Sequence, residues 1–206
     1  MNRTVSMAGA ALVTVTVFLF AAFILLGFPF GYYFVCMFLP VGYLMMTAGL
    51  HHESGSDRKV AADTGLVLAG VYAVLVLLVY FAQTTTVRTE VLNDQASRIL
   101  NFRRGGLIFN YDLLGYGMMA LSTFFTGLSM KAETKADRWL RRLLIIHGAF
   151  FPGCFLMPMT GMFASMADGK GGNGGYIALL LWCLFFLPVG ALAFRHFRLR
   201  REDSSC

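Results

Sequence analysis

Residues 4–50 read TVSMAGAALVTVTVFLFAAFILLGFPFGYYFVCMFLPVGYLMMTAGL, without a single Asp, Glu, Lys or Arg. A helix needs about 20 predominantly apolar residues to cross the hydrocarbon core of a bilayer, so this stretch has room for two crossings. Gly-Phe-Pro-Phe-Gly at positions 27–31 lies in its middle, and this combination is typical of a tight turn between helices. No water-soluble fold needs so long an apolar stretch, which therefore predicts an integral membrane protein.

The rest of the chain continues this composition. Of the 206 residues, 57% are hydrophobic and 14% are charged, whereas soluble domains carry about a quarter charged residues. We predict one polytopic membrane domain over residues 1–206, an all-α bundle of about six transmembrane helices. The predicted spans are 7–27, 32–50, 62–82, 110–130, 143–166 and 176–194. The first of them lacks a cleavage site and exceeds a signal-peptide core, so we expect it to be retained.

Basic residues predict the orientation of these helices. With the N-terminus inside, 12 of the 17 Lys and Arg residues fall on inner segments and 5 on outer ones. Because inner loops are enriched in Lys and Arg, both chain ends are expected in the cytoplasm. The basic tail 195–201 then faces anionic lipids of the inner leaflet. No basic stripe interleaved with aromatics appears, so nucleic acid is not an expected partner despite the net charge of +6.

The connection between the third and fourth spans is the long one. Apolar residues recur there at helical spacing: Val87, Val91, Leu92, Ala96, Ile99 and Leu100. This pattern predicts an outer amphipathic helix over residues 87–102, which lies on the bilayer surface or, alternatively, covers the bundle mouth as a lid.

Two further patterns concern helix packing. Gly65, Ala69 and Ala73 are spaced four apart and predict a smooth face for close helix contact. Prolines inside the predicted spans favour kinks, and these are Pro40, Pro152, Pro158 and Pro188.

Ionisable groups within membrane spans are costly and usually functional, and Asp112, near the outer end of the predicted span 110–130, is the best candidate of this kind. Tyr116 follows at i+4 and so shares its helix face. The rival interpretation is structural: Asn110 caps the helix and Asp112, in its first turn, complements the helix dipole. In both interpretations Arg103 and Arg104 are expected ion-pair partners of Asp112.

Other polar residues gather near the same outer boundary. They are Tyr80, Gln83, Arg88 and Arg103, which join Asp112 and Tyr116. If the bundle has an outward-facing pocket, we expect Tyr80, Gln83, Arg103, Asp112 and Tyr116 to form its ligand-binding site.

Metal and catalytic patterns are weak. His51, His52, Glu53 and Asp57 follow the second span, but adjacent helical residues point about 100° apart, so we interpret them as a solvated turn. His147 is expected to form hydrogen bonds across helices. Met159, Met162 and Met166 share a face and suggest Cu(I) as an alternative, although Met commonly fills irregular cores. We expect no catalytic residue, no metal and no cofactor, and an enzyme is the least favoured class.

Part of the chain resembles a known group. The stretches at 80–88 (YFAQTTTVR), 112–116 (DLLGY) and 118–125 (MMALSTFF) are similar to segments of a broad group of uncharacterised bacterial membrane proteins. The resemblance covers roughly residues 60–130. It implies a bacterial cytoplasmic membrane, the six-helix topology, and interest in Gln83 and Asp112, but no reaction.

Two functions follow as hypotheses. The first is binding or translocation of a small ligand or ion from the outer side. The alternative is a non-catalytic partner or sensor subunit with a solid interior, which docks another protein through the basic inner loop 131–142 or the tail. Expected partners are the lipid bilayer, a small molecule or ion, and a protein partner or second copy of the chain.

Overall fold

A computed structural model describes residues 1–163 and 174–199, and within these ranges every regular element is a helix. The α-helices are α1 (Asn2–Leu25), α2 (Pro29–Cys36), α3 (Phe38–His52), α4 (Lys59–Thr84), α5 (Thr86–Thr89), α6 (Asp94–Leu100), α7 (Leu107–Ser129), α8 (Lys135–His147), α9 (Phe150–Leu156) and α10 (Gly174–Leu199). The 3-10 helices are η1 (Ser56–Arg58), η2 (Phe102–Arg104) and η3 (Met157–Thr160). Residues 164–166 of the predicted fifth span, with Met166, lie outside the described ranges.

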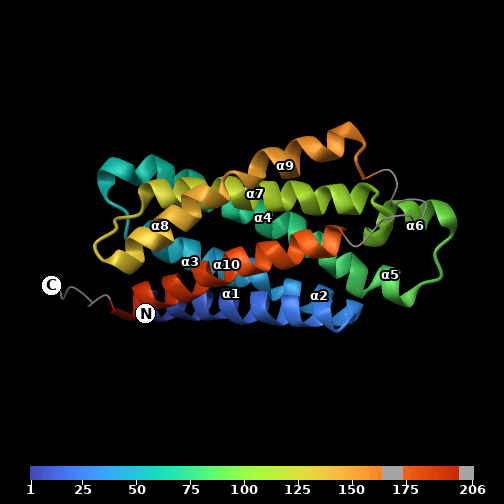
Figure 1. The fold of residues 1–206 in the computed structure, drawn as a ribbon, viewed down its shortest axis with the longest axis horizontal. Helices are drawn as coiled ribbons and strands as arrows, with labels where there is room; N and C mark the ends of the chain where they lie inside the picture. The colour runs from blue at the N-terminus through green and yellow to red at the C-terminus, as the bar shows by residue number, and fades with distance from the viewer. Residues whose placement is uncertain (164–173, 200–206) are drawn as a thin grey trace.

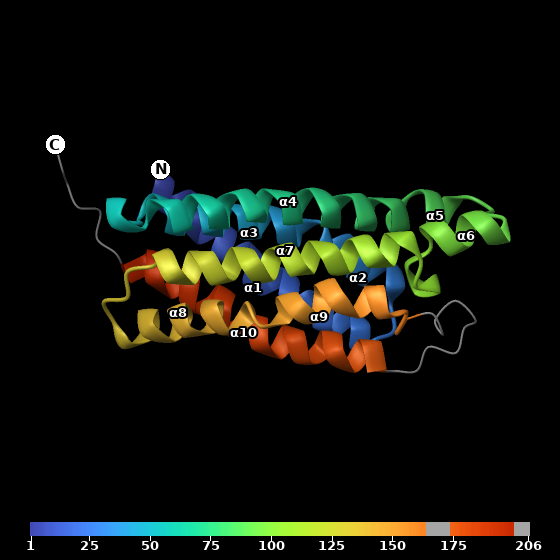
Figure 2. The ribbon, with the colours of Figure 1, turned by 90° about the horizontal axis from the view of Figure 1, so that it is seen from above.

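The long helices run along one axis and form a closed ring of neighbours (Figure 1, Figure 2). α1 packs against α3, α3 against α4, α4 against α7, α7 against α8, α8 against α10, and α10 returns to α1. α1 begins and α10 ends at the same end of the bundle, where Arg3 Nε donates a 2.8 Å hydrogen bond to the carbonyl of Phe197. This end is called the terminal end below, and the opposite end, with α5 and α6, the distal end.

Among the described residues, five helical stretches are long and apolar enough to cross a membrane. They are Asn2–Leu25, Pro29–His52, Ser56–Thr89, Lys135–Thr160 and Gly175–Leu199. α7 has 23 residues, but it carries Asn110, Asp112 and several Gly, Ser and Thr residues, which lower its hydropathy. The fold is thus all-helical with helices fit to span a membrane, and the crossing by α7 stays a prediction.

Apolar side chains on the outside of the bundle agree with a lipid environment. On α4, Val67, Val71, Val74, Leu78 and Phe81 are 66%, 42%, 59%, 63% and 61% exposed. Their spacing makes one continuous stripe along the helix. Soluble monomers rarely expose long apolar stripes, so this face is suited to hydrocarbon.

Two predicted spans are interrupted, and proline explains both interruptions. The span 32–50 is divided between α2 and α3 at Met37, and the span 143–166 between α8 and α9 at Gly148. A proline ring clashes with the carbonyl of residue i−4 and supplies no N–H to it. For Pro40 that residue is Cys36, the last residue of α2, and for Pro152 it is Gly148, the first residue after α8. Pro188, by contrast, lies inside an unbroken α10.

The prediction of one outer amphipathic helix over 87–102 is wrong. α5 ends at Thr89, Glu90 is extended, and α6 begins only at Asp94. Asn93 caps α6 by accepting a 2.8 Å hydrogen bond from the Ala96 N–H. A good N-cap residue begins a new helix. The apolar residues that were expected to lie on one helix are therefore divided among α5, α6 and the residues between and after them.

The predicted inner loop 131–142 is also largely helical, because α8 begins at Lys135. Thr134 and Asp137 form a reciprocal capping box: the Thr134 hydroxyl accepts from Asp137 N–H at 3.1 Å, and the Asp137 carboxylate accepts from Thr134 N–H at 2.9 Å. A capping box satisfies two unpaired helix-start donors and fixes the helix start.

The small-residue face of α4 is confirmed as a packing surface. A Cβ on Gly65 would lie 2.7 Å from Thr126 Oγ1 and 3.2 Å from the Ser122 carbonyl of α7. Ala69 is fully buried and Ala73 nearly so. α4 and α7 therefore approach each other closely, and residues of these two helices form most of the candidate site.

Candidate functional site

Asp112 lies in the second turn of α7, and its side chain is buried at 3% exposure. The structural interpretation of Asp112 is wrong, because α7 begins at Leu107 after Gly106, and Asn110 is an exposed residue inside the helix. Gly105, with φ of 62°, ends η2 in the left-handed conformation that favours glycine. The chain therefore turns at Gly105 and starts the helix earlier than the Asn110 signal suggests.

The Asp112 carboxylate has few partners. Tyr80 donates a long hydrogen bond of 3.5 Å to Oδ2, and Oδ1 has no partner. The predicted ion pairs with Arg103 and Arg104 do not form. Arg104 Nη2 instead pairs with Asp94 Oδ1 at 2.8 Å, and Arg103 Nη2 donates to the Tyr32 hydroxyl at 3.3 Å. Asp112 is thus a buried carboxylate without a cationic partner in the described part of the chain.

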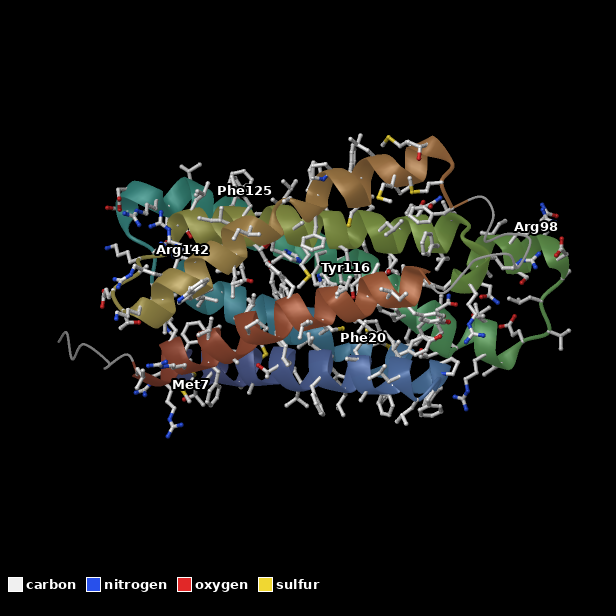
Figure 3. All side chains as sticks on the ribbon, viewed as in Figure 1. Met7, Phe20, Arg98, Tyr116, Phe125 and Arg142 are labelled. Carbon is white, nitrogen blue, oxygen red and sulfur yellow. The ribbon has the colours of Figure 1, made fainter. Side chains whose placement is uncertain are left out.

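Tyr72 and Tyr116 lie close enough to Asp112 for their hydroxyl groups to interact electrostatically with its carboxylate. Their hydroxyls are buried and also lack hydrogen-bond partners, and their rings are 5.7 Å apart. Figure 3 shows Tyr116 in the middle of the bundle, where its ring packs 5.3 Å from that of Trp182 of α10. Cys36, fully buried at the α2–α3 break, lies beside Tyr80 and Tyr116. We name Cys36, Tyr72, Tyr80, Asp112 and Tyr116 the central polar cluster.

Gln83 is buried one turn above Tyr80, but its amide is engaged by the backbone. Its Nε2 donates to the Leu100 carbonyl at 2.8 Å, and its Oε1 accepts from Phe102 N–H at 3.0 Å. Because a buried backbone group without a partner is costly, this side chain holds the backbone of residues 100–102 against α4. Gln83 therefore lies near the other residues of the predicted ligand-binding site. Its amide, however, is already hydrogen-bonded to the backbone of Leu100 and Phe102.

Arg103 lies in a separate pocket of about 390 Å³ at the distal end, which it lines with Tyr32 and Tyr176 among others. The hydrogen bond with Tyr32 raises the pKa of the Arg103 guanidinium above its ordinary value, so this side chain is a fixed cation. From Tyr32 the rings continue inward: Tyr32 to Tyr33 is 4.5 Å and Tyr33 to Tyr80 is 5.9 Å between centroids. A series of tyrosines thus connects this pocket with Asp112. Arg88 lies apart from it, 4.4 Å over the Phe30 ring.

His147 forms hydrogen bonds across helices, which confirms the prediction. Trp182 Nε1 donates to His147 Nε2 at 3.0 Å, so that nitrogen is an acceptor. The proton of the neutral ring is then on Nδ1, which donates to Thr123 Oγ1 at 2.8 Å. The Thr123 hydroxyl donates in turn to the Ala120 carbonyl at 2.8 Å. Each polar side-chain atom in this series of hydrogen bonds has a partner within the series, so we interpret His147 as a structural residue.

A second charged group at the terminal end was missed by sequence reasoning. His196 lies between two carboxylates, with Nδ1 at 2.7 Å from Asp137 Oδ1 and Nε2 at 2.8 Å from Glu53 Oε2. Carboxylates accept only, so both ring nitrogens donate and the ring carries a positive charge. The three residues belong to different helix ends, and no spacing in the sequence indicates that they meet.

The polar residues at the end of α3 agree only in part with the predicted solvated turn. His51 contacts Asp63 at 2.5 Å and His52 contacts Asn2 at 3.2 Å, while Glu53 belongs to the His196 group. In the described ranges, no group of three or more His, Cys, Asp or Glu residues is arranged to hold a metal ion.

The chain matches no protein-family model, no curated protein and no solved structure. Its class is defined by the fold and the site alone: an all-helical protein, with helices fit to span a membrane, that buries a carboxylate among tyrosines. The resemblance of residues 60–130 to bacterial membrane proteins stays a prediction.

Proposed function

We propose that this chain is a six-crossing membrane protein, with both ends in the cytoplasm, that binds a proton or a small cation at Asp112. The ligand reaches Asp112 from the outer side, and the central polar cluster holds it. In this proposal the distal end faces outward and the terminal end faces the cytoplasm.

The observation that carries the proposal is the set of unused polar atoms around Asp112. Oδ1 of Asp112 and the hydroxyls of Tyr72 and Tyr116 are buried without partners. Burying an unpaired carboxylate costs several kcal/mol, and intramembrane acids are functional by default. A bound proton or cation removes that cost, and the phenol oxygens are suitable neutral ligands for a hard cation.

The position of Asp112 supports access from the distal end. Five residues separate it from the first residue of α7, which at 1.5 Å per residue is roughly 8 Å. The tyrosine series from the Arg103 pocket through Tyr33 and Tyr80 leads to the same carboxylate. A ligand therefore crosses a short, polar-lined distance rather than the whole bundle.

The size of the ligand follows from packing. Asp112 and the surrounding tyrosines are at most 8% exposed, and the Tyr72 and Tyr116 rings pack 5.7 Å apart, so the space beside the carboxylate suits a proton, a single ion or an ordered water. This filled interior is also what the alternative predicts, a partner or sensor subunit without a ligand. The two functions therefore differ in whether Asp112 has a ligand at all.

The topology in the proposal rests on three supports. Lys and Arg favour the terminal end by 12 to 5 in the predicted segments, and the ends of α1 and α10 lie together. The 23 residues of α7 reach about 35 Å, enough to cross a bilayer. Because α4, α8 and α9 contact it, α7 can span without being apolar on every face.

The test is the stability of the purified full chain in detergent, with Na⁺, K⁺, Li⁺ or choline at constant ionic strength. A ligand that binds only the folded state at 100 times its Kd stabilises it by about 2.7 kcal/mol. We expect one cation to raise the unfolding temperature of the wild type and to have no effect on Asp112→Asn. If the ligand is a proton, infrared spectra of the wild type contain a protonated-carboxyl band that Asp112→Asn lacks.

Asp57→Asn is the matched control, because Asp57 is exposed at the terminal end. Asp57→Asn should keep whichever signature the wild type shows, the cation effect on the unfolding temperature or the protonated-carboxyl band. A wild type that responds to no cation and lacks an Asp112 carboxyl band contradicts the proposal and favours the partner or sensor subunit.

A further inference from the structure

A second pocket, of about 550 Å³, lies at the terminal end between α8 and α10. It is remote from the central polar cluster, which lies toward the distal end. Lys135 and Arg195 line it, and both side chains are exposed. Neither cation forms an ion pair within residues 1–163 and 174–199. Two free cations at one pocket attract an anionic group.

The two walls of the pocket change from charged to apolar in the same direction. On α8, Lys135, Trp139 and Leu143 follow one another at four-residue spacing and share a face. On α10, Leu192 and Arg195 are three residues apart and share a face on the other wall. The cations therefore lie at the end of the bundle, and the leucines lie deeper along the membrane-spanning part.

Trp139 marks the boundary between these two parts. Its side chain is 59% exposed, although it is the largest apolar group of α8. Tryptophan is enriched at membrane–water interfaces, where its ring sits at the level of lipid headgroups. Arg142 lies 5.7 Å from the indole ring centre and adds positive charge nearby.

The pocket is held in shape by the buried charged group beside it. Asp137, two residues after Lys135, contacts His196 at 2.7 Å, and His196 adjoins Arg195. The Asp137 carboxylate also caps α8 through the Thr134 N–H. A 2.7 Å contact thus joins α8 to α10 beside the pocket, so the two walls that carry the cations are held together.

We propose that this pocket binds one anionic phospholipid. The phosphate lies between Lys135 and Arg195, the glycerol ester part of the lipid lies at Trp139, and an acyl chain follows Leu143 and Leu192. A soluble phosphate ester satisfies the cations but leaves the apolar wall uncovered. A zwitterionic phospholipid covers the apolar wall, but the positive charge of its headgroup opposes binding beside two cations. Basic pockets between helices on the cytoplasmic side are suited to anionic headgroups.

The test is native mass spectrometry of the full chain released from detergent micelles that contain phosphatidylglycerol or phosphatidylcholine. We expect one phosphatidylglycerol to remain bound at concentrations at least tenfold below those needed for phosphatidylcholine. Each cation near an anionic headgroup contributes about fivefold in affinity, so Lys135→Gln with Arg195→Gln should weaken phosphatidylglycerol binding about thirtyfold.

The matched control is Arg138→Gln with Arg198→Gln, which removes the same charge from the same two helices outside the pocket. It should keep the affinity within about threefold, and circular dichroism verifies that both double variants fold. Equal binding of the two lipids, or equal loss in both double variants, overturns the proposal. Displacement of the lipid by glycerol 3-phosphate at equal concentration also overturns it, because the site is then one for soluble anions.

Discussion

Gln83→Leu is the change that best separates anchoring from ligand binding. The Gln83 amide holds the Leu100 carbonyl at 2.8 Å and the Phe102 N–H at 3.0 Å. Leucine keeps the size of the side chain and removes both hydrogen bonds. A neutral hydrogen bond contributes about 1 kcal/mol, so the free energy of opening the segment 94–106 should fall by about 2 kcal/mol.

Hydrogen exchange measures this opening directly, since amides exchange from locally open states. A decrease of about 2 kcal/mol corresponds to roughly thirtyfold faster exchange. We expect the acceleration in peptides covering residues 94–106 and no change in peptides from α1. Gln95→Leu is the matched control, because Gln95 is exposed on α6 in the same segment.

Unchanged exchange over 94–106 in Gln83→Leu contradicts the anchoring role. Equally faster exchange over 94–106 in Gln83→Leu and Gln95→Leu also contradicts it, because any Gln to Leu change then loosens the segment. If exchange is unchanged but the cation effect on stability disappears, Gln83 acts on the ligand and the original site prediction for it holds.

Two further predictions concern the packing that supports the sites. Gly65→Ala should destabilise the bundle by about 1–3 kcal/mol in denaturant unfolding, because its Cβ meets Thr126 Oγ1 at 2.7 Å. Gly70→Ala meets nothing within 4 Å and should be neutral or slightly stabilising; equal effects of the two changes refute the close α4–α7 contact. His196→Ala should lower the free energy of unfolding by about 3 kcal/mol in the same assay, because it leaves Asp137 buried without its cation. A decrease of less than about 0.5 kcal/mol shows that the charged group does not hold α8 to α10.

The positions of most long helices were predictable because apolar runs are local properties of the chain. Residues 4–50 contain enough uncharged sequence for two helices, and α1 and α2–α3 occupy it. The face made by Gly65, Ala69 and Ala73 was predictable for the same reason, since helical spacing alone places these residues together. Prolines predicted kinks, and the i−4 rule explains why the breaks occur at Met37 and Gly148.

Contacts between distant segments were not predictable, because no periodicity records them. Gln83 contacts a backbone segment about twenty residues later, and Glu53 meets His196 from the other end of the chain. The start of a helix was predicted incorrectly where the backbone conformation of the preceding residues determines it. The positive φ of Gly105 moves the start of α7 to Leu107, and this removes both the cap role of Asn110 and the ion pairs expected for Asp112.

α7 carries the candidate site and is not among the five stretches that are long and apolar enough to cross a membrane, and both facts have one cause. α7 is in contact with α4, α8 and α9, so several of its faces meet protein rather than lipid. A polar side chain on such a face avoids the cost of facing hydrocarbon and can pair with a neighbour. Ser122 shows the structural use of this freedom, since it accepts from Tyr43 and donates to the Gly65 carbonyl. Asp112, on the same helix, has no comparable set of partners, and the missing partner is what the proposed ligand supplies.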